Sequence, residues 1–259
     1  VDVCIGEKED DPVFCITDLL IHLSGEQMEK KAAKVIEGEA LNLLIGNIPL
    51  ADQEETAVKA NVLKLLKQQY DIDEDDFLSA ELEVVPAGKA RECGLDRSMV
   101  LAYGHDDRVC AYTSLAAMLD MKKVKRTACC ILVDKEEIGS VGATGMQSRF
   151  FENTVAELLN CMGDYSDIKL RRVLANSRML SSDVSAAFDP EFASAFEKKN
   201  TAYFAHGIVF NKYTGSRGKS GSNDANAEYM AQLRTTLEKH EVAFQTAELG
   251  KVDFGGGGT

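Results

Sequence analysis

Hydrophobic and polar positions follow two different patterns, before and after about residue 79. In the first part, residues 12–16 and 41–46 are short apolar runs, and the glycine that ends the second predicts a buried strand. Aliphatic residues recur at helical spacing among lysines in residues 58–66, which predicts an amphipathic helix. Residues 71–76 are acidic but lack the glycine and the distal Glu of a calcium loop, so we expect a solvated loop.

Strand and helix patterns alternate from residue 79 onward. Residues 81–86 alternate like a strand that is stopped by proline, and residues 128–133 are apolar throughout, as in a strand buried on both faces. We expect further strands at residues 202–204, 207–210 and 242–245, and helices at 114–121, 155–162 and 225–240, the last capped by Ser222 or Asn223. This alternation predicts an α/β fold, with a mostly parallel sheet sandwiched by helices.

Composition narrows the class of protein. The 259 residues are 45% hydrophobic and 27% charged, which is typical of a globular chain and not of a disordered, collagen-like or membrane-spanning one. The 42 acidic residues outnumber the 29 basic ones and give a net charge of -13. An acidic surface repels phosphate groups, so we expect neither nucleic acid nor a membrane as a partner.

The cysteines bear on the compartment in which the protein works, and the two ends of the chain bear on whether it is a fragment. There are seven cysteines, none in a C-x-x-C motif, and Cys129 and Cys130 lie inside an apolar run, which favours buried free thiols in a cytoplasmic protein. No charged region precedes an apolar one as in a secretory signal. The chain opens at Val1 in strand-like sequence and closes on a glycine-rich stretch, so we expect it to be a fragment of a longer polypeptide.

Candidate chemistry lies in three acidic clusters at the ends of predicted strands, where α/β folds keep their sites. They are residues 104–108, 134–140 and 181–184. In the second cluster, Glu136 and Glu137 are adjacent, and adjacent side chains of an extended backbone point to opposite sides. One of these two carboxylates could bind a cation while the other moves a proton.

Carboxylates from three loops, together with histidines, suit a hydrolytic site with two zinc ions roughly 3.5–4 Å apart that share an activated water. The alternative is that each cluster is a solvated strand end or a helix cap. The pattern alone leaves both interpretations open.

Five segments resemble motifs of the aspartyl and vacuolar-type dinuclear zinc aminopeptidase family. Residues 106–111, 133–140 and 181–185 resemble its metal-site motifs. Residues 212–216 and the terminal glycine-rich loop resemble the bacterial aminopeptidase-one type. The resemblance covers nearly the whole chain, and it implies the zinc exopeptidase version of the α/β fold.

The resemblance also implies a role for each acidic residue. Asp106 would bridge the two zinc ions, Glu137 and Asp183 would each bind one ion, and Glu136 would be the general base. Asp107 would be a neighbour of the ligands rather than a ligand itself. The family also uses two histidine ligands, which we expect to come from residues outside this chain. Zinc is the expected cofactor, with cobalt or manganese as possible replacements.

Substrate contacts are implied at three further residues. His22 lies in a segment that resembles part of the family's assembly domain, from which a histidine reaches the site of a neighbouring subunit. A structural role for His22 stays open. Lys212 and Tyr213 are expected to line the substrate cleft.

Together these observations predict a metallo-aminopeptidase that removes the N-terminal residue from peptides. Residues 1–78 would be part of an inserted dimerisation and assembly domain, and residues 79–259 an incomplete catalytic domain. The resemblance implies a homo-oligomer that forms a large tetrahedral complex.

Two alternatives stay open. The chain could be an inactive truncated core or an assembly module. A remote alternative is an NTP-binding protein, because residues 217–220 resemble the end of a phosphate loop, although Tyr213 stands where that motif needs glycine.

Overall fold

The structure is a computed structural model that describes residues 1–53, 55–213, 223–251 and 253. The chain forms two compact units, Val1–Tyr103 and Gly104–Thr259. Each unit is described by itself below. The two units are defined by contacts within the chain and are not the two predicted domains. The domain boundary between residues 78 and 79 stays a prediction.

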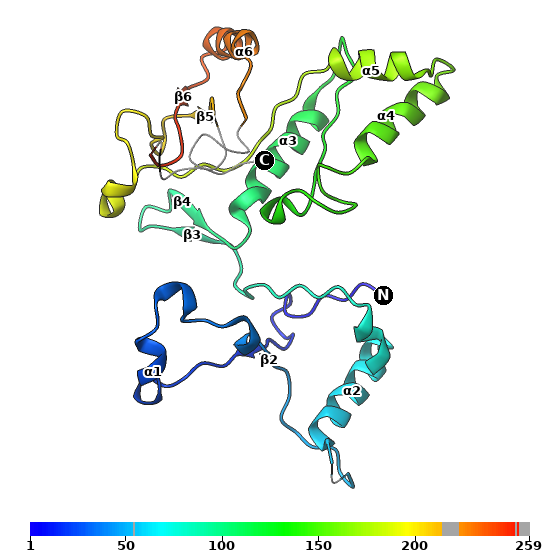
Figure 1. Ribbon diagram of the computed structural model, residues 1–259, viewed down its shortest axis with the longest axis vertical. Helices are drawn as coiled ribbons and strands as arrows, with labels where there is room; N and C mark the ends of the chain where they lie inside the picture. The colour runs from blue at the N-terminus through cyan, green and yellow to red at the C-terminus, as the bar shows by residue number, and fades with distance from the viewer. Residues whose placement is uncertain (54, 214–222, 252, 254–259) are drawn as a thin grey trace. The chain divides into compact units, whose positions relative to one another are not determined.

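Short elements make up the beginning of the first unit (Figure 1). Strand β1 (Cys15–Ile16) pairs antiparallel with β2 (Leu43–Leu44), and between them lie η1 (Ile21–Leu23), α1 (Gly25–Met28), η2 (Ala32–Lys34) and η3 (Gly38–Ala40). The predicted buried strand at residues 41–46 is therefore wrong in length and in burial. Leu41, Leu44 and Ile45 are about half exposed, because among the described residues only the two-residue β1 pairs with this strand.

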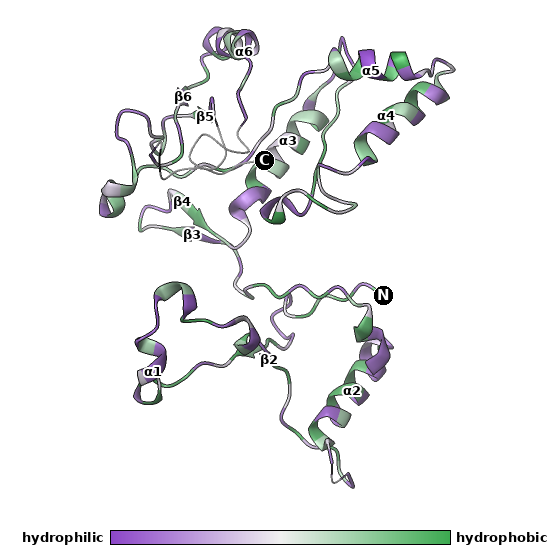
Figure 2. Cartoon of the chain, in the orientation of Figure 1, coloured by the Kyte–Doolittle hydropathy of each residue, from purple (hydrophilic) through white to green (hydrophobic). Residues whose placement is uncertain are grey.

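Helix α2 (Ala57–Tyr70) confirms the amphipathic helix expected around residues 58–66. Apolar and polar residues are interspersed along it (Figure 2). The acidic stretch after it is more ordered than a solvated loop. Asp73 and Asp76 form a capping box at the start of η4 (Glu74–Leu78), and Lys67 of α2 pairs with Asp71 at 2.5 Å and with Asp73 at 2.8 Å.

The first unit ends with a hairpin that the sequence pattern did not predict. Strands β3 (Arg91–Cys93) and β4 (Met99–Leu101) pair antiparallel around a turn in which Gly94 has a φ of +87°. The strand predicted at residues 81–86 is wrong, since that segment joins no sheet in the described chain and its aliphatic side chains are at least half exposed.

Helices dominate the second unit. They are α3 (His105–Asp120), η5 (Glu136–Ile138), α4 (Phe150–Cys161), α5 (Asp167–Ala175), η6 (Pro190–Ala195) and α6 (Ala227–Lys239). The three predicted helices are confirmed, although α3 and α4 begin earlier than expected. The predicted cap of α6 is wrong: the Asn226 side chain accepts a hydrogen bond from the Tyr229 backbone at 2.8 Å.

Within the described residues, parallel pairing occurs once between named strands, where β5 (Ile208–Phe210) lies beside β6 (Phe244–Thr246). Ala187 and Ala202 add an isolated parallel bridge. The fully buried strand predicted at residues 128–133 is wrong, because no described segment pairs with it and Leu132 is 58% exposed.

Aromatic and small residues form the packed part of the second unit. The Phe188 ring lies 5.7 Å from the Phe196 ring and 5.6 Å from the Tyr203 ring, and Phe210 and Phe244 meet across β5 and β6 at 5.9 Å. Helices α4 and α5 pack against each other.

All seven cysteines are free thiols, as predicted, but each is exposed or half-buried rather than buried. Within the described ranges, no helix is both long and apolar enough to cross a membrane.

Candidate metal centre

The start of α3 presents the first two acidic residues. Gly104 precedes the helix with a φ of +76°, and its carbonyl accepts a hydrogen bond from the Arg108 backbone at 3.1 Å. Asp106 and Asp107 follow with non-helical dihedral angles, and the peptide bond between them is cis. Their carboxylates therefore lie where the loop turns into the helix.

A third carboxylate comes from the segment that follows α5. The Asp183 Oδ1 atom accepts a hydrogen bond from the Val184 backbone at 2.7 Å. A few residues later, Ala187 bridges to Ala202 and Phe188 donates to the carbonyl of Ala202 at 2.8 Å. These bonds tie the Asp183 segment to the packed part of the second unit.

Asp106, Asp107 and Asp183 converge. One carboxylate oxygen of each residue lies within 4.8 Å of the other two, although Asp183 is far along the chain from the other pair. Asp106 and Asp183 are exposed and Asp107 is half-buried. We call these three residues the carboxylate cluster.

Glu136 and Glu137 lie in the single turn of η5, which begins after Lys135 in a left-handed conformation. Glu136 is half-buried. Burial raises the pKa of its carboxyl, and the negative charges of Asp183, Glu137 and Asp106 raise it further. Glu136 is thus close enough to the carboxylate cluster to interact with it electrostatically. Glu137 is exposed, and its carboxylate is not among the three oxygens that converge.

Like charges dominate the carboxylate cluster. Although Asp183 is exposed as a residue, partial desolvation of its carboxyl raises its pKa, the Val184 amide lowers it, and Asp106 and Asp107 raise it again. Burial, a hydrogen bond to Asp107 and the neighbouring negative charges raise the pKa of the Cys110 thiol to about 12. Three carboxylates packed this closely repel one another unless a cation or a proton intervenes.

A divalent cation fits these residues. Among the described residues, the ion pairs of the second unit involve other carboxylates, such as Asp134 with Lys135 at 3.3 Å, and none includes a member of the carboxylate cluster. In addition, the Asp107 Oδ1 atom is buried without a hydrogen-bond partner. Carboxylate oxygens are ligands for zinc, magnesium and manganese alike, so the donor set itself does not choose among these metals.

The structure brings some of the predicted site residues close to one another. Asp106 and Asp183 lie together, and Glu136 is electrostatically coupled to them. Asp107, which the resemblance placed beside the ligands, lies as close as they do. The roles of bridge, ligand and base remain predictions.

The three predicted substrate residues, His22, Lys212 and Tyr213, are not among the residues that converge at the carboxylate cluster. His22 lies in η1 of the first unit. Lys212 pairs with Asp224 and donates to the Ala225 carbonyl, and its ammonium group lies 5.2 Å from the centre of the Tyr213 ring. None of these partners belongs to the carboxylate cluster. Residues 217–220, with the phosphate-loop resemblance, lie outside the described residues.

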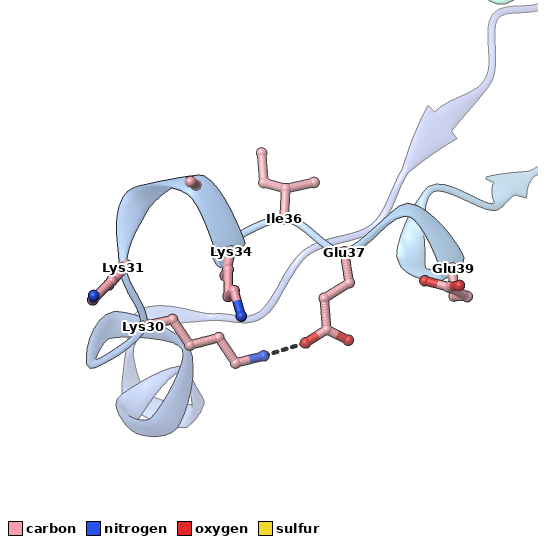
Figure 3. Close-up of a pocket in the computed structure, with 7 residues that line it drawn as sticks. Lys30, Lys31, Lys34, Ile36, Glu37 and Glu39 are labelled. Atoms are coloured by element: carbon pink, nitrogen blue, oxygen red, sulfur yellow. Dashed lines mark hydrogen bonds and ion pairs between the residues drawn. The ribbon is translucent and has the colours of Figure 1, made fainter.

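A pocket of about 410 Å³ lies in the first unit, between η2 and η3 (Figure 3). Its lining is Lys30, Lys31, Ala33, Lys34, Ile36, Glu37 and Glu39. Lys30 and Glu37 pair across it at 2.5 Å, so part of its charge is already neutralised.

Comparison with known proteins gives a consistent answer. The family model of the aminopeptidase I zinc metalloproteases (M18) matches residues 4–259. A probable M18 family aminopeptidase 1 from Clostridium acetobutylicum is 66% identical over 260 residues, which cover 100% of this chain and 56% of the relative.

Solved structures of M18 aminopeptidases are also similar to this chain. The crystal structure of aminopeptidase I from Clostridium acetobutylicum has a TM-score of 0.90 at 65% identity and covers 100% of this chain and 56% of that one. An M18 aminopeptidase from Thermotoga maritima has a TM-score of 0.94 at 45% identity, with 100% and 57% coverage. The mApe1 dodecamer of S. cerevisiae shares only the fold, at 17% identity and a TM-score of 0.54 over 83% of this chain and 50% of that one.

These likenesses confirm the predicted fold class, an α/β fold of the zinc exopeptidase type, and the family resemblance seen in the motifs. The chain spans just over half the length of the curated relatives that it matches. It belongs to the M18 family, the aminopeptidase I zinc metalloproteases.

Proposed function

We propose that the polypeptide containing this chain is a zinc-dependent aminopeptidase, which removes the N-terminal residue from peptides. The observation that carries the proposal is the carboxylate cluster, formed beside Glu136 by a chain of the M18 family. Cobalt and manganese are alternative metals, because oxygen ligands accept all three ions.

Asp106 and Asp183 would hold the metal in this proposal, with Asp106 between two ions and Asp183 on one of them. Glu137 would contribute to the other ion. Bound zinc would polarise the scissile carbonyl and lower the pKa of a water molecule. The Asp107 Oδ1 atom is buried without a hydrogen-bond partner. It would either orient the neighbouring metal ligands or bind the metal as a further ligand.

Glu136 would accept a proton from the attacking water and pass it to the leaving nitrogen. Two features support this role. Its carboxylate is half-buried close to the carboxylate cluster, and its pKa is raised by burial and by neighbouring carboxylates. A raised pKa improves the return of the proton to the leaving group, which a carboxyl of ordinary acidity would do less well.

The test is Glu136→Gln in the complete polypeptide, measured with a peptide substrate. We expect kcat to fall by roughly 10²–10⁴-fold, because a general acid–base group contributes about that much, while bound zinc stays constant. Glu157→Gln is a matched control, since Glu157 is an exposed residue of α4. Activity within threefold of the parent enzyme would show that Glu136 is not the base.

Assembly and substrate access belong to the same proposal. We infer that the polypeptide forms a homo-oligomer. This oligomer would be a tetrahedral complex that encloses the active site and admits short peptides. The dodecamer of the distant S. cerevisiae relative supports oligomer formation. Exposed apolar side chains in the first unit, such as Leu20, Ile21 and Leu23, supply surface that another subunit could bury. Light scattering of the complete polypeptide tests this inference.

A further inference from the structure

The loop of residues 134–148, between α3 and α4 in Figure 1, closes on itself. At its base, the Asp134 amide donates to the Thr144 carbonyl at 3.1 Å. Inside it, the amides of Gly139 and Ser140 donate to the carbonyls of Glu136 and Lys135, both at 2.8 Å. The turn that carries Glu136 is therefore held by its own loop.

Gln147 links the far side of this loop to that turn twice. Its side-chain Nε2 donates to the Gly139 carbonyl at 2.7 Å, and its backbone amide donates to the Ser140 carbonyl at 3.1 Å. Gly139 directly follows η5. A side-chain bond to this carbonyl therefore fixes the end of the turn that presents Glu136 and Glu137.

Position 145 has room only for glycine. It is buried, and a Cβ atom at this position would lie 2.2 Å from the Ser140 carbonyl oxygen and 2.4 Å from the Val141 oxygen. Both neighbours are backbone atoms, and neither can move aside without opening the loop. Ser140 itself is buried at 8% exposure and holds a φ of +58°, so the chain reverses tightly around it.

Electrostatics explains why such closure matters. Glu136 and Glu137 are adjacent carboxylates in η5, and the three residues of the carboxylate cluster belong to the same unit. Mutual repulsion favours a loop that swings the Glu136 side chain into solvent. A loop closed by fixed hydrogen bonds opposes that motion and keeps the carboxylate in place before any metal arrives.

We propose that Gly145 and Gln147 are positioning residues, which close the 134–148 loop and so hold Glu136 toward the carboxylate cluster. This inference rests on the proposed function for the role of Glu136, while the closure of the loop stands on the hydrogen bonds alone. Gly145 acts by leaving room for the Ser140 carbonyl, and Gln147 acts through its bond to the Gly139 carbonyl.

Two substitutions in the complete polypeptide test the inference. Gln147→Met removes the side-chain donor at nearly constant size, and Gly145→Ala places a methyl group against the Ser140 carbonyl. Gln68→Met and Gly88→Ala are matched controls: Gln68 is exposed on α2, and a Cβ at Gly88 would meet nothing within 4 Å. If Gly145→Ala fails to fold, Gln147→Met alone decides.

The first measurement is hydrogen–deuterium exchange of the metal-free protein over residues 134–148. We expect about tenfold faster exchange in both variants and unchanged exchange in both controls, because the loop opens locally. The second measurement is steady-state kinetics with zinc present. We expect kcat to fall roughly a hundredfold, as for a displaced catalytic group, with KM and bound zinc unchanged.

Three results would overturn the inference: exchange at the parent rate, faster exchange with kcat unchanged, or loss of bound zinc together with kcat. The last result would mean that the loop supports the metal rather than Glu136. Failure of the proposed function looks different, because Glu136→Gln would then keep its activity whatever the loop variants do. The exchange measurement would still decide whether Gly145 and Gln147 close the loop.

Discussion

The convergence of like charges is the main feature at the scale of single residues. Acidic clusters at the ends of predicted strands, together with the family resemblance of residues 106–111 and 181–185, pointed to Asp106 and Asp183. The sequence could not show that Asp107 would lie equally close, since that depends on the non-helical turn at the start of α3. Nor could it show that Glu137 would lie apart from the three converging oxygens.

Removing one charge from the carboxylate cluster should weaken metal binding. For Asp183→Asn in the complete polypeptide, we expect zinc affinity to fall at least about 100-fold, because a ligand is lost. For Asp107→Asn we expect a decrease of roughly 10–100-fold if it orients the ligands. Titration calorimetry against a competing chelator measures both.

Asp189→Asn is the control for these two variants. Asp189 caps η6 through the Glu191 amide at 2.9 Å and is not one of the three converging carboxylates. Equal zinc affinity in Asp183→Asn and Asp189→Asn would remove Asp183 from the metal site.

Helices and strands differed in how well the sequence predicted them. Helix α2 was found because its apolar face is encoded within a few turns of chain. Residues 128–133 were misassigned because a strand is completed by partners distant in sequence, and none pairs with this segment in the described chain. The β3–β4 hairpin was missed because its strands are three residues long and show little alternation.

Loss of the Asn226 cap should loosen the start of α6. We expect Asn226→Ala to destabilise this helix by about 1 kcal/mol, because the Tyr229 amide loses its acceptor. Asn153→Ala, at an exposed interior position of α4, should cause no loss, since alanine favours helices. Amide exchange at residues 227–230 measures the effect, and equal protection in the two variants would contradict it.

For the molecule as a whole, the family and the fold class were accessible from sequence because several motifs occur together along the chain. Burial was not. Many apolar residues of both units are exposed, and the chain spans just over half the length of its curated relatives. Hydrophobic pattern tells which faces can be covered, but not what covers them.

Stability of the whole protein should depend jointly on metal and pH. The pKa values of Glu136 and Asp183 are raised in the folded state, first by desolvation of the two carboxyl groups. Without metal, their contribution to stability is therefore present below their unfolded pKa values and is lost as the pH rises through the folded values. Zinc competes with these protons, so its stabilising effect should increase with pH.

Thermal melts with and without zinc check this dependence. We expect the increase in Tm on adding zinc to be larger at pH 7.5 than at pH 5. In Asp183→Asn the difference between the two pH values should shrink, because one titrating carboxyl is gone. An increase in Tm that is the same at both pH values would contradict the assignment of these carboxyls to the metal site.

The most direct test of the proposed metal centre is a zinc anomalous difference map from crystals of the complete polypeptide. We expect a peak about 2.0–2.2 Å from carboxylate oxygens of Asp106 and Asp183, the usual zinc–oxygen distance. Glu136 should face the same space without binding the ion. Zinc bound elsewhere, with Asp106 and Asp183 facing apart, would contradict the central claim that these carboxylates form the metal centre.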